Sequence, residues 1–235
     1  MLNQKQRNQI VKQLELHRHK KYQQDIMIDS LVLPNFVIFP EVFRADIMTS
    51  SIYTAKFLIQ KPEFYQNKHV IDMGCGSGIL GIVMAKRGAE SVLLADISYH
   101  AIANAWENIT QYGMVMRLAC GYPYHSDLFS AIRAKYDLIV FNHPFFSDEI
   151  GFPDQPISGS MVAPSILIHR FLEEAKGHLT KEGKIIMPFL EIAGETNDPK
   201  IQAPKHGYTV QQVYSTNVES GVQTGLFYVY VLNLR

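Results

Sequence analysis

The stretch from residue 69 to residue 81, HVIDMGCGSGILG, constrains the fold of this chain more than any other. It starts with the β-branched residues Val70 and Ile71, ends its apolar part near Asp72, and continues with glycines at three alternate positions: Gly74, Gly76 and Gly78. A strand, a glycine loop and an apolar helix in that order leave backbone N–H groups open to a ligand, because glycine has no Cβ to block the approach. The sequence therefore predicts a ligand site at the end of a buried strand.

Two ligand classes fit this loop. Residues 76–81 match the dinucleotide pattern G-x-G-x-x-G, and Asp96 follows 18 residues after Gly78, near the spacing of a ribose-binding acid. The longer pattern D-x-G-x-G-x-G, which starts at Asp72, resembles motif I of class I S-adenosylmethionine (SAM) methyltransferases. A carboxylate at the strand end suits the ammonium and sulfonium groups of SAM and would repel a pyrophosphate. The loop favours SAM, with a nicotinamide dinucleotide as the alternative.

The charge of the chain is balanced overall but uneven along its length. Lys plus Arg and Asp plus Glu both total 22 in 235 residues, so no overall field attracts nucleic acid or an anionic membrane. The first 24 residues are basic, with one acid, Glu15, and six cations: Lys5, Arg7, Lys12, Arg18, Lys20 and Lys21. We expect a solvated leading helix here, with an arm for nucleic acid or an acidic partner as the alternative.

Cysteine content and hydropathy indicate the compartment. Cys75 and Cys120 are the two cysteines, and neither has a C-x-x-C neighbour, so neither a disulfide framework nor a metal site is predicted. No apolar run is long enough to cross a membrane, and polar sequence follows the basic start where a signal peptide would be apolar. We expect a cytoplasmic protein.

The remaining pattern predicts an α/β fold. Residues 2–24 predict a polar helix, residues 26–39 a strand pair, and residues 46–60 a helix. From residue 68 strands and helices alternate, which argues for a parallel sheet with helices on both faces. The predicted strands are 69–73, 91–96, 114–119, 136–141 and 183–189, with two more near 207–210 and 225–232. The predicted helices between them are 78–87, 98–111, a short one near 128–134, and 163–179.

Polar residues follow four of these strands, where ligands of open parallel sheets bind. They are Asp72, Asp96, the segment Ser126-Asp127-Leu128-Phe129 and the segment Asn142-His143-Pro144-Phe145. A single acid at such a place is commonly a helix cap. Four polar strand ends in register predict a binding site.

The segments SDLFSAI and YDLIVFNHPFF resemble the HemK/PrmC-type glutamine N-methyltransferases and related N-methyltransferases that share Asn/Asp-x-Pro-Tyr/Phe. The resemblance covers about residues 35–235 and implies a Rossmann-like SAM-methyltransferase sheet, mostly parallel, with an antiparallel C-terminal hairpin. It implies that Asp96 holds the ribose, that Asp127 contacts the adenine amine, and that the glycine loop surrounds the methionine part. The predicted SAM ligands are Asp72, Gly74, Cys75, Gly76, Gly78, Asp96, Ile97, Asp127, Leu128 and Asn142.

The Asn142–Phe145 motif also has a chemical rationale. The lone pair of an amide or exocyclic amine is delocalised, so the nitrogen needs two acceptors that fix its N–H groups before it attacks a methyl group. The side-chain carbonyl of Asn142 and the backbone carbonyl of His143 provide them, Pro144 stiffens the turn, and Phe145 offers a flat face. These four residues are the predicted catalytic set.

The motif departs from the glutamine-methyltransferase pattern Asn-Pro-Pro-Tyr at two positions. His143 replaces the first proline and Phe145 replaces the tyrosine, which leaves the acceptor open. Residues 1–45 are predicted to form a helix and hairpin extension of a methyltransferase domain at 46–235. Residues 146–162 are a candidate substrate lid or an inert loop. Residues 39–43, with Thr49 and Ser50 beyond them, are a candidate cover over SAM or a structural hairpin.

The predicted function is SAM-dependent methylation of an amide or exocyclic amine nitrogen, in a protein glutamine or a nucleobase. A small amine-bearing metabolite is the alternative acceptor. The sequence is also compatible with an NAD(P)-binding oxidoreductase and with a catalytically inactive SAM-binding subunit. The substrate is thus a protein, an RNA or a small molecule, and the oligomeric state is left open.

Overall fold

The computed structural model describes residues 3–17, 20–119, 121–147, 160–219 and 224–235. Its centre is a seven-stranded sheet in the order β5-β4-β3-β6-β7-β9-β8. The strands are β3 (His69–Met73), β4 (Ser91–Asp96), β5 (Tyr124–His125), β6 (Tyr136–Phe141), β7 (Leu179–Leu190), β8 (Tyr208–Glu219) and β9 (Thr224–Leu234). Neighbours from β5 to β7 are parallel, and β9 pairs antiparallel with both β7 and β8. This confirms the predicted fold class.

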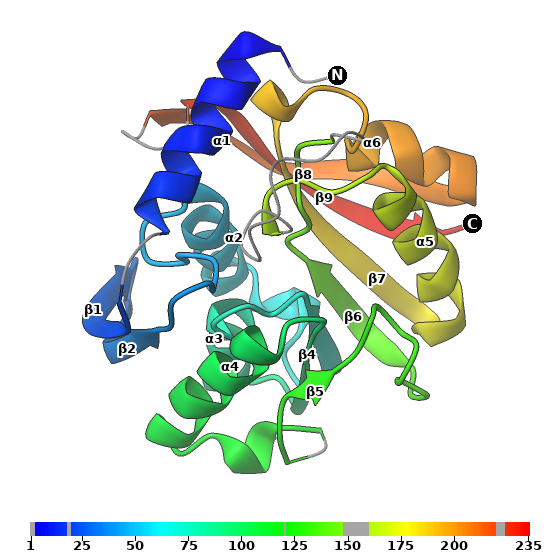
Figure 1. Ribbon diagram of the computed structural model, residues 1–235. Coiled ribbons are helices and arrows are strands. Elements are labelled where there is room, and N and C mark those ends of the chain that lie inside the picture. Colours follow the sequence, from blue (N-terminus) through cyan, green and yellow to red (C-terminus); the bar gives the residue numbers. More distant parts are fainter. Residues whose placement is uncertain (1–2, 18–19, 120, 148–159, 220–223) are drawn as a thin grey trace.

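Helices cover both faces of the sheet (Figure 1). The helices α2 (Thr49–Gln60), α3 (Ile79–Lys86) and α4 (Tyr99–Gln111) lie on one side, and α5 (Ile166–Ala175) lies on the other with the short α6 (Pro199–Gln202). The inner strands β3 and β6 are almost wholly buried, as expected of a parallel sheet covered twice. Among the described residues, no helix is both long and apolar enough to span a bilayer.

The chain order reverses between β3 and β6, which positions the site. From β3 the chain moves outward to β4 and β5, then returns to the other side of β3 as β6. Asp72 pairs with Val140 and Met73 with Phe141, so these two strands end side by side. The glycine loop and the Asn142 segment therefore emerge next to each other at the place where open α/β sheets bind ligands.

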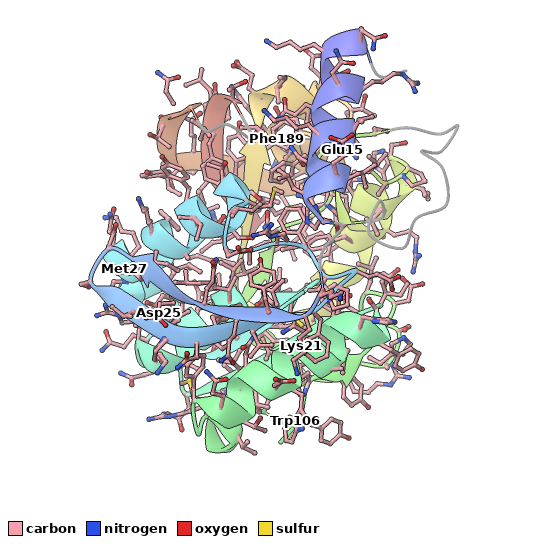
Figure 2. All side chains as sticks on the ribbon, turned by 60° about the vertical axis from the view of Figure 1, so that its left-hand side comes forward. Glu15, Lys21, Asp25, Met27, Trp106 and Phe189 are labelled. Carbon is pink, nitrogen blue, oxygen red and sulfur yellow. The ribbon has the colours of Figure 1, made fainter. Side chains whose placement is uncertain are left out.

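The N-terminal segments form a helix and a hairpin outside the main sheet. Helix α1 (Gln4–Leu16) precedes β1 (Tyr22–Ile28) and β2 (Leu31–Ile38), which pair antiparallel. The hairpin lies over α4, and Met27 is exposed near its outer end (Figure 2). Two asparagines of α4 hold it, since Asn104 and Asn108 both donate to the carbonyl of Val37.

Several predicted elements need correction. The leading helix ends at Leu16, not at residue 24, because Tyr22 already pairs with Ile38 in the hairpin. The strand predicted at 114–119 is wrong: residues 115–117 form a 3₁₀ turn, and the edge strand is β5. The helix near 128–134 is a turn, since the left-handed φ of Leu128 (46°) breaks a helix.

Further corrections concern mainly the C-terminal half. The helix predicted at 163–179 spans residues 166–175 and tightens into a 3₁₀ turn at residues 176–178. The tail strands extend to 208–219 and 224–234, because the polar stretch of β8 pairs along β9 at the sheet edge. The strand predicted at 183–189 and the strand pair predicted at 26–39 each begin four residues earlier, at Leu179 and Tyr22, and the other elements lie within three residues of their predicted bounds.

Candidate active site

A cavity of about 260 Å³ opens at the C-terminal ends of β3, β4 and β6. Its walls come from the glycine loop, the segments after β4 and β6, the segment from Glu41 to Ser51, and α1. All thirteen residues of the predicted SAM and catalytic sets except Gly78 line it. Gly78 lies at the start of α3, where a Cβ would come within 3.2 Å of Ala105 Cβ.

The glycine loop needs glycine for its backbone conformation. The φ angles of Gly74, Gly76 and Gly78 are all positive, at 64°, 54° and 84°, which L side chains rarely adopt. A Cβ on Gly74 would also lie 3.2 Å from the ring of Phe141. The loop thus keeps its backbone open toward the cavity.

Asp72 is buried at the end of β3, with 2% of its surface exposed. Its Oδ2 accepts the backbone N–H of Gly81 at 2.8 Å. Burial raises the pKa of the Asp72 carboxyl to about 7, the Gly81 N–H opposes this, and the charge of Asp96 adds to it. A cationic group of a ligand in this cavity would favour the ionised form.

Asp96 ends β4 and supports the glycine loop directly. Its Oδ2 accepts the N–H of Gly76 at 2.9 Å, and its Oδ1 accepts the N–H of Ser98 at 2.8 Å. Burial raises the pKa of Asp96, while these N–H groups lower it. Each carboxylate oxygen keeps a further lone pair, so Asp96 has capacity left for hydroxyl donors. Its neighbour Ile97 is largely exposed at the rim.

Asp127 lies at the same rim and has a partner that the sequence did not predict. Its Oδ2 accepts from Arg170 Nη2 of α5 at 3.1 Å, and Arg170 also reaches Glu174. The preceding Ser126 is buried and donates to the carbonyl of Leu128, which closes the turn.

Asn142 follows β6 and faces the start of α2. Its Nδ2 makes long hydrogen bonds to Ser50 Oγ (3.5 Å) and Ser51 Oγ (3.4 Å). These two hydroxyls orient the amide, and its Oδ1 has no protein partner in the described part of the chain. An unengaged carbonyl oxygen beside the glycine loop is the acceptor that the predicted chemistry requires.

His143 is buried, with 3% of its surface exposed, and its Nε2 lies 3.0 Å from the carbonyl of Asn197. A carbonyl only accepts, so Nε2 carries the proton. Burial lowers the pKa of His143 to about 4, so the ring is neutral, and its Nδ1 has no partner in the described structure. Phe145 packs edge-on against His143 (5.3 Å) and Phe189 (5.5 Å).

The structure describes the candidate cover at residues 39–43 in full and the candidate lid at residues 146–162 only in part. Val42 and Phe43 of the 39–43 segment line the cavity beside Glu41. Most of the 146–162 segment, residues 148–159, lies outside the described residues. At its two ends Phe146 pairs with Met161 and Ala163 through backbone hydrogen bonds.

Four contributors were missed by the sequence reasoning: Gln13, Ser51, Asn197 and Arg170. Gln13 had a signal, because it lies on the same face of α1 as the apolar Ile10 and Leu14. The others contact the site only through tertiary packing.

Cys75 is buried as a free thiol, and burial raises its pKa well above the usual range, so it is an unreactive wall residue. Among the described residues no group of His, Cys, Asp and Glu side chains is arranged to hold a metal ion.

Known proteins resemble this chain in sequence and in structure. The release factor glutamine methyltransferase of Streptococcus pneumoniae is 33% identical over 149 residues, which cover 57% of this chain and 49% of that protein. The ribosomal RNA small subunit methyltransferase C of Actinobacillus succinogenes is 31% identical over 147 residues, covering 62% of this chain and 38% of that protein. The chain thus spans half or less of the length of these two relatives.

Among solved structures, the Thermus thermophilus 16S rRNA N2 G1207 methyltransferase in complex with AdoMet and guanosine shares the fold. Its TM-score is 0.64 at 17% identity, over 92% of this chain and 51% of that one. The sequence profile of the methyltransferase small domain matches residues 40–192, well over half of the chain. The chain therefore belongs to the methyltransferase small domain family and is a SAM-dependent methyltransferase.

Proposed function

We propose that this chain transfers the methyl group of SAM to an amide or exocyclic amine nitrogen of a macromolecule. The observation that carries the proposal is the orientation of Asn142. Ser50 and Ser51 engage its NH₂ group, so its carbonyl oxygen is left to accept an N–H of the substrate. That oxygen lies in the cavity that also contains the glycine loop and Asp72.

The cavity suits SAM as the methyl donor. Four carboxylates line it, Glu41, Asp72, Asp96 and Asp127, and none of its described lining residues is Lys or Arg. This charge favours a ligand with a sulfonium and an ammonium group. Gly74 and Gly76 line the cavity without a Cβ, so a ligand can approach the backbone of the glycine loop closely.

The chemistry then depends on positioning. SAM supplies an electrophilic methyl group and a neutral leaving group. Asn142 Oδ1 and the backbone carbonyl of His143 fix the two N–H groups, which orients the nitrogen lone pair toward the methyl group. The nitrogen loses its proton only after the transfer, so no side chain needs to act as a base first. The neutral His143 ring agrees with this, because a group with a pKa of about 4 is a weak base.

The names of the relatives support both nitrogen classes. One relative is named for glutamine in a release factor, and the structural neighbour is named for N2 of a guanine. Both nitrogens are planar and carry N–H groups that need acceptors, so the Asn142 geometry serves either.

The test uses methyl-labelled SAM with a cell extract separated into protein and RNA fractions. Mass spectrometry of the digested products should find the label on a glutamine side chain or on an exocyclic amine. Asn142→Ala should bind SAM almost as tightly as the unchanged protein but turn over slower by about two to four powers of ten, because one of two orienting acceptors is lost.

A matched control is Thr110→Ala, which removes an exposed hydroxyl of α4 far from Asn142. That variant should keep full turnover. Label on oxygen or carbon, or an Asn142→Ala variant that methylates at the normal rate, would contradict the proposal.

A further inference from the structure

Gln13 of α1 carries a buried amide that no described residue satisfies. The side chain lines the cavity and is 1% exposed, and its Nε2 has no hydrogen-bond partner in the described structure. Its backbone carbonyl is engaged, since His17 Nδ1 lies 2.6 Å from it. Buried N–H groups nearly always have an acceptor, and because Gln13 also lines the cavity, a ligand bound there can supply one.

Helix α1 is fixed on both sides of Gln13, so this side chain is held in place at the cavity wall. Near its start, Gln6 Nε2 donates to the carbonyl of Ile192 at 2.9 Å. Past its end, His17 Nε2 accepts the backbone N–H of Arg44 at 2.9 Å, and its ring stacks on Phe43 at 5.4 Å. Figure 1 shows α1 above α2 at this side of the sheet.

These contacts place Gln13 at one particular end of the cavity. Phe43 and Arg44 belong to the segment that leads into α2, where Ser50 and Ser51 meet Asn142. The predicted adenine contact, Asp127, follows β5 instead. If the adenine of SAM lies at Asp127, as the family resemblance implies, the part of SAM near Gln13 is its methionine portion, next to the reacting methyl group.

The α-carboxylate of that portion needs neutral donors, because the described lining holds four carboxylates and no Lys or Arg. Three side-chain donors of the lining are already engaged, whereas the hydroxyls of Ser50 and Ser51 accept from Asn142 and the hydroxyl of Ser77 is buried without a partner in the described structure. Asn142 donates to the two serines, Ser126 to Leu128, and His143 to Asn197. The amide of Gln13 is not engaged in this way.

We propose that Gln13 Nε2 donates a hydrogen bond to the α-carboxylate of SAM, and that α1 is thereby part of the methyl-donor site. The inference rests on the donor site described under the proposed function. It adds to the SAM-binding residues one that lies outside residues 40–192, the part of the chain that matches the family profile.

Calorimetry with two ligands tests this assignment. S-adenosylhomocysteine has the α-carboxylate, and 5′-methylthioadenosine has the same nucleoside without the amino-acid end. Gln13→Leu removes the donor and keeps most of the volume. It should weaken S-adenosylhomocysteine about tenfold or more, as expected for a hydrogen bond to a charged group, and leave 5′-methylthioadenosine unchanged.

Gln9→Leu is the matched control. Gln9 lies one turn earlier on α1, its Nε2 is also buried without a partner, and it does not line the cavity. This variant should bind both ligands like the unchanged protein. Gln13→Met provides a second, unbranched replacement if the leucine variant fails to fold.

The outcomes separate this inference from the proposed function. If the unchanged protein binds S-adenosylhomocysteine and both Gln13 variants bind it equally well, the role of Gln13 is wrong while the donor site stands. Equal weakening of both ligands would mean that Gln13 only packs α1, which also overturns the role. If the unchanged protein binds neither ligand, the donor site itself fails.

Discussion

His143 and Asp72 are buried titratable residues of the cavity wall, and burial moves their pKa values in opposite directions. The pKa of His143 falls to about 4 and that of Asp72 rises to about 7. In both cases burial disfavours the charged form. The two residues therefore make the stability of the protein depend on pH with opposite signs.

For His143 we expect stability to be lost on acidification. Below about pH 6.5 the unfolded chain protonates this histidine and the folded chain does not, until the pH approaches about 4. Its contribution to the free energy of unfolding should fall by about 2 kcal/mol between about pH 7 and about pH 5. Urea unfolding of the protein and of His143→Asn at both values measures this as the change in their difference. An unchanged difference would show that His143 is not held neutral.

For Asp72 we expect the reverse. Between about pH 4 and about pH 7 the folded chain holds a proton on this carboxyl and the unfolded chain does not, so acidification stabilises the fold. Relative to Asp72→Asn, which keeps an acceptor for the Gly81 N–H, the protein without ligand should gain roughly 2 kcal/mol between about pH 7 and about pH 5. Equal slopes for the two proteins in urea unfolding would contradict this. Because the two effects offset each other, only the single variants reveal them.

At the scale of single residues, the sequence predicts where the site residues lie better than it predicts which side chains they contact. Asp72, Asp96, Asp127 and Asn142 occur at the cavity, because a strand end is visible as the point where an apolar run stops. Their contacts depend on elements far away in the chain, such as Arg170 on α5 for Asp127. No local pattern encodes which side chain of α5 reaches that strand end.

At the scale of elements, α4 replaces a missing strand partner for the hairpin. Asn108 is fully buried, and its amide accepts from Val37 N (2.8 Å) and donates to Val37 O (2.9 Å), as a neighbouring strand would. Its Nδ2 also donates to the carbonyl of Ser77 in the glycine loop at 3.0 Å. One side chain thus joins β2, α4 and the loop that is predicted to hold SAM.

Replacing Asn108 by leucine should therefore destabilise the protein strongly. The change leaves the N–H of Val37 and the carbonyl of Ser77 buried without this partner, and each such group costs about 1–3 kcal/mol. We expect a loss of roughly 3 kcal/mol in urea unfolding, together with weaker binding of S-adenosylhomocysteine. Thr110→Ala, at the exposed end of the same helix, is the control, because the Thr110 hydroxyl bonds only to carbonyls of α4, and it should change stability by less than about 1 kcal/mol. A loss no larger than that of the control would exclude this joining role.

Elements with a continuous apolar run were predicted well, and elements set by distant pairing were not. Strands 69–73, 91–96 and 136–141 match because both of their faces are buried. The apolar run at 114–119 has only one bridge to the sheet, between Leu118 and Val92, and the edge strand forms at Tyr124, where it pairs with Ala95. A two-residue edge strand carries no periodicity from which it could be read.

At the scale of the whole molecule, the basic N-terminal segment is a candidate contact for an RNA substrate. The basic N-terminal segment is in large part the helix α1, on which Lys5 and Lys12 are exposed. Lys21 is instead paired with Glu107 at 2.7 Å and lies over the ring of Phe39. The number of cations available to phosphates is therefore smaller than the sequence alone suggests.

We expect that these cations do not bind RNA, because the protein is neutral overall and the described cavity lining is acidic. The variant Lys5→Gln, Arg7→Gln, Lys12→Gln keeps α1 and Gln13 in place, which deletion of residues 1–24 would not. Affinity for a short mixed-sequence RNA, measured by fluorescence anisotropy over a range of salt, should be weak, with a shallow log-log slope that the variant leaves unchanged. Each phosphate contact of a single strand adds about 0.7 to the slope, so three contacts would add about 2. A steep slope that becomes shallower by about that amount in the variant would identify RNA as the partner of α1 and overturn this expectation.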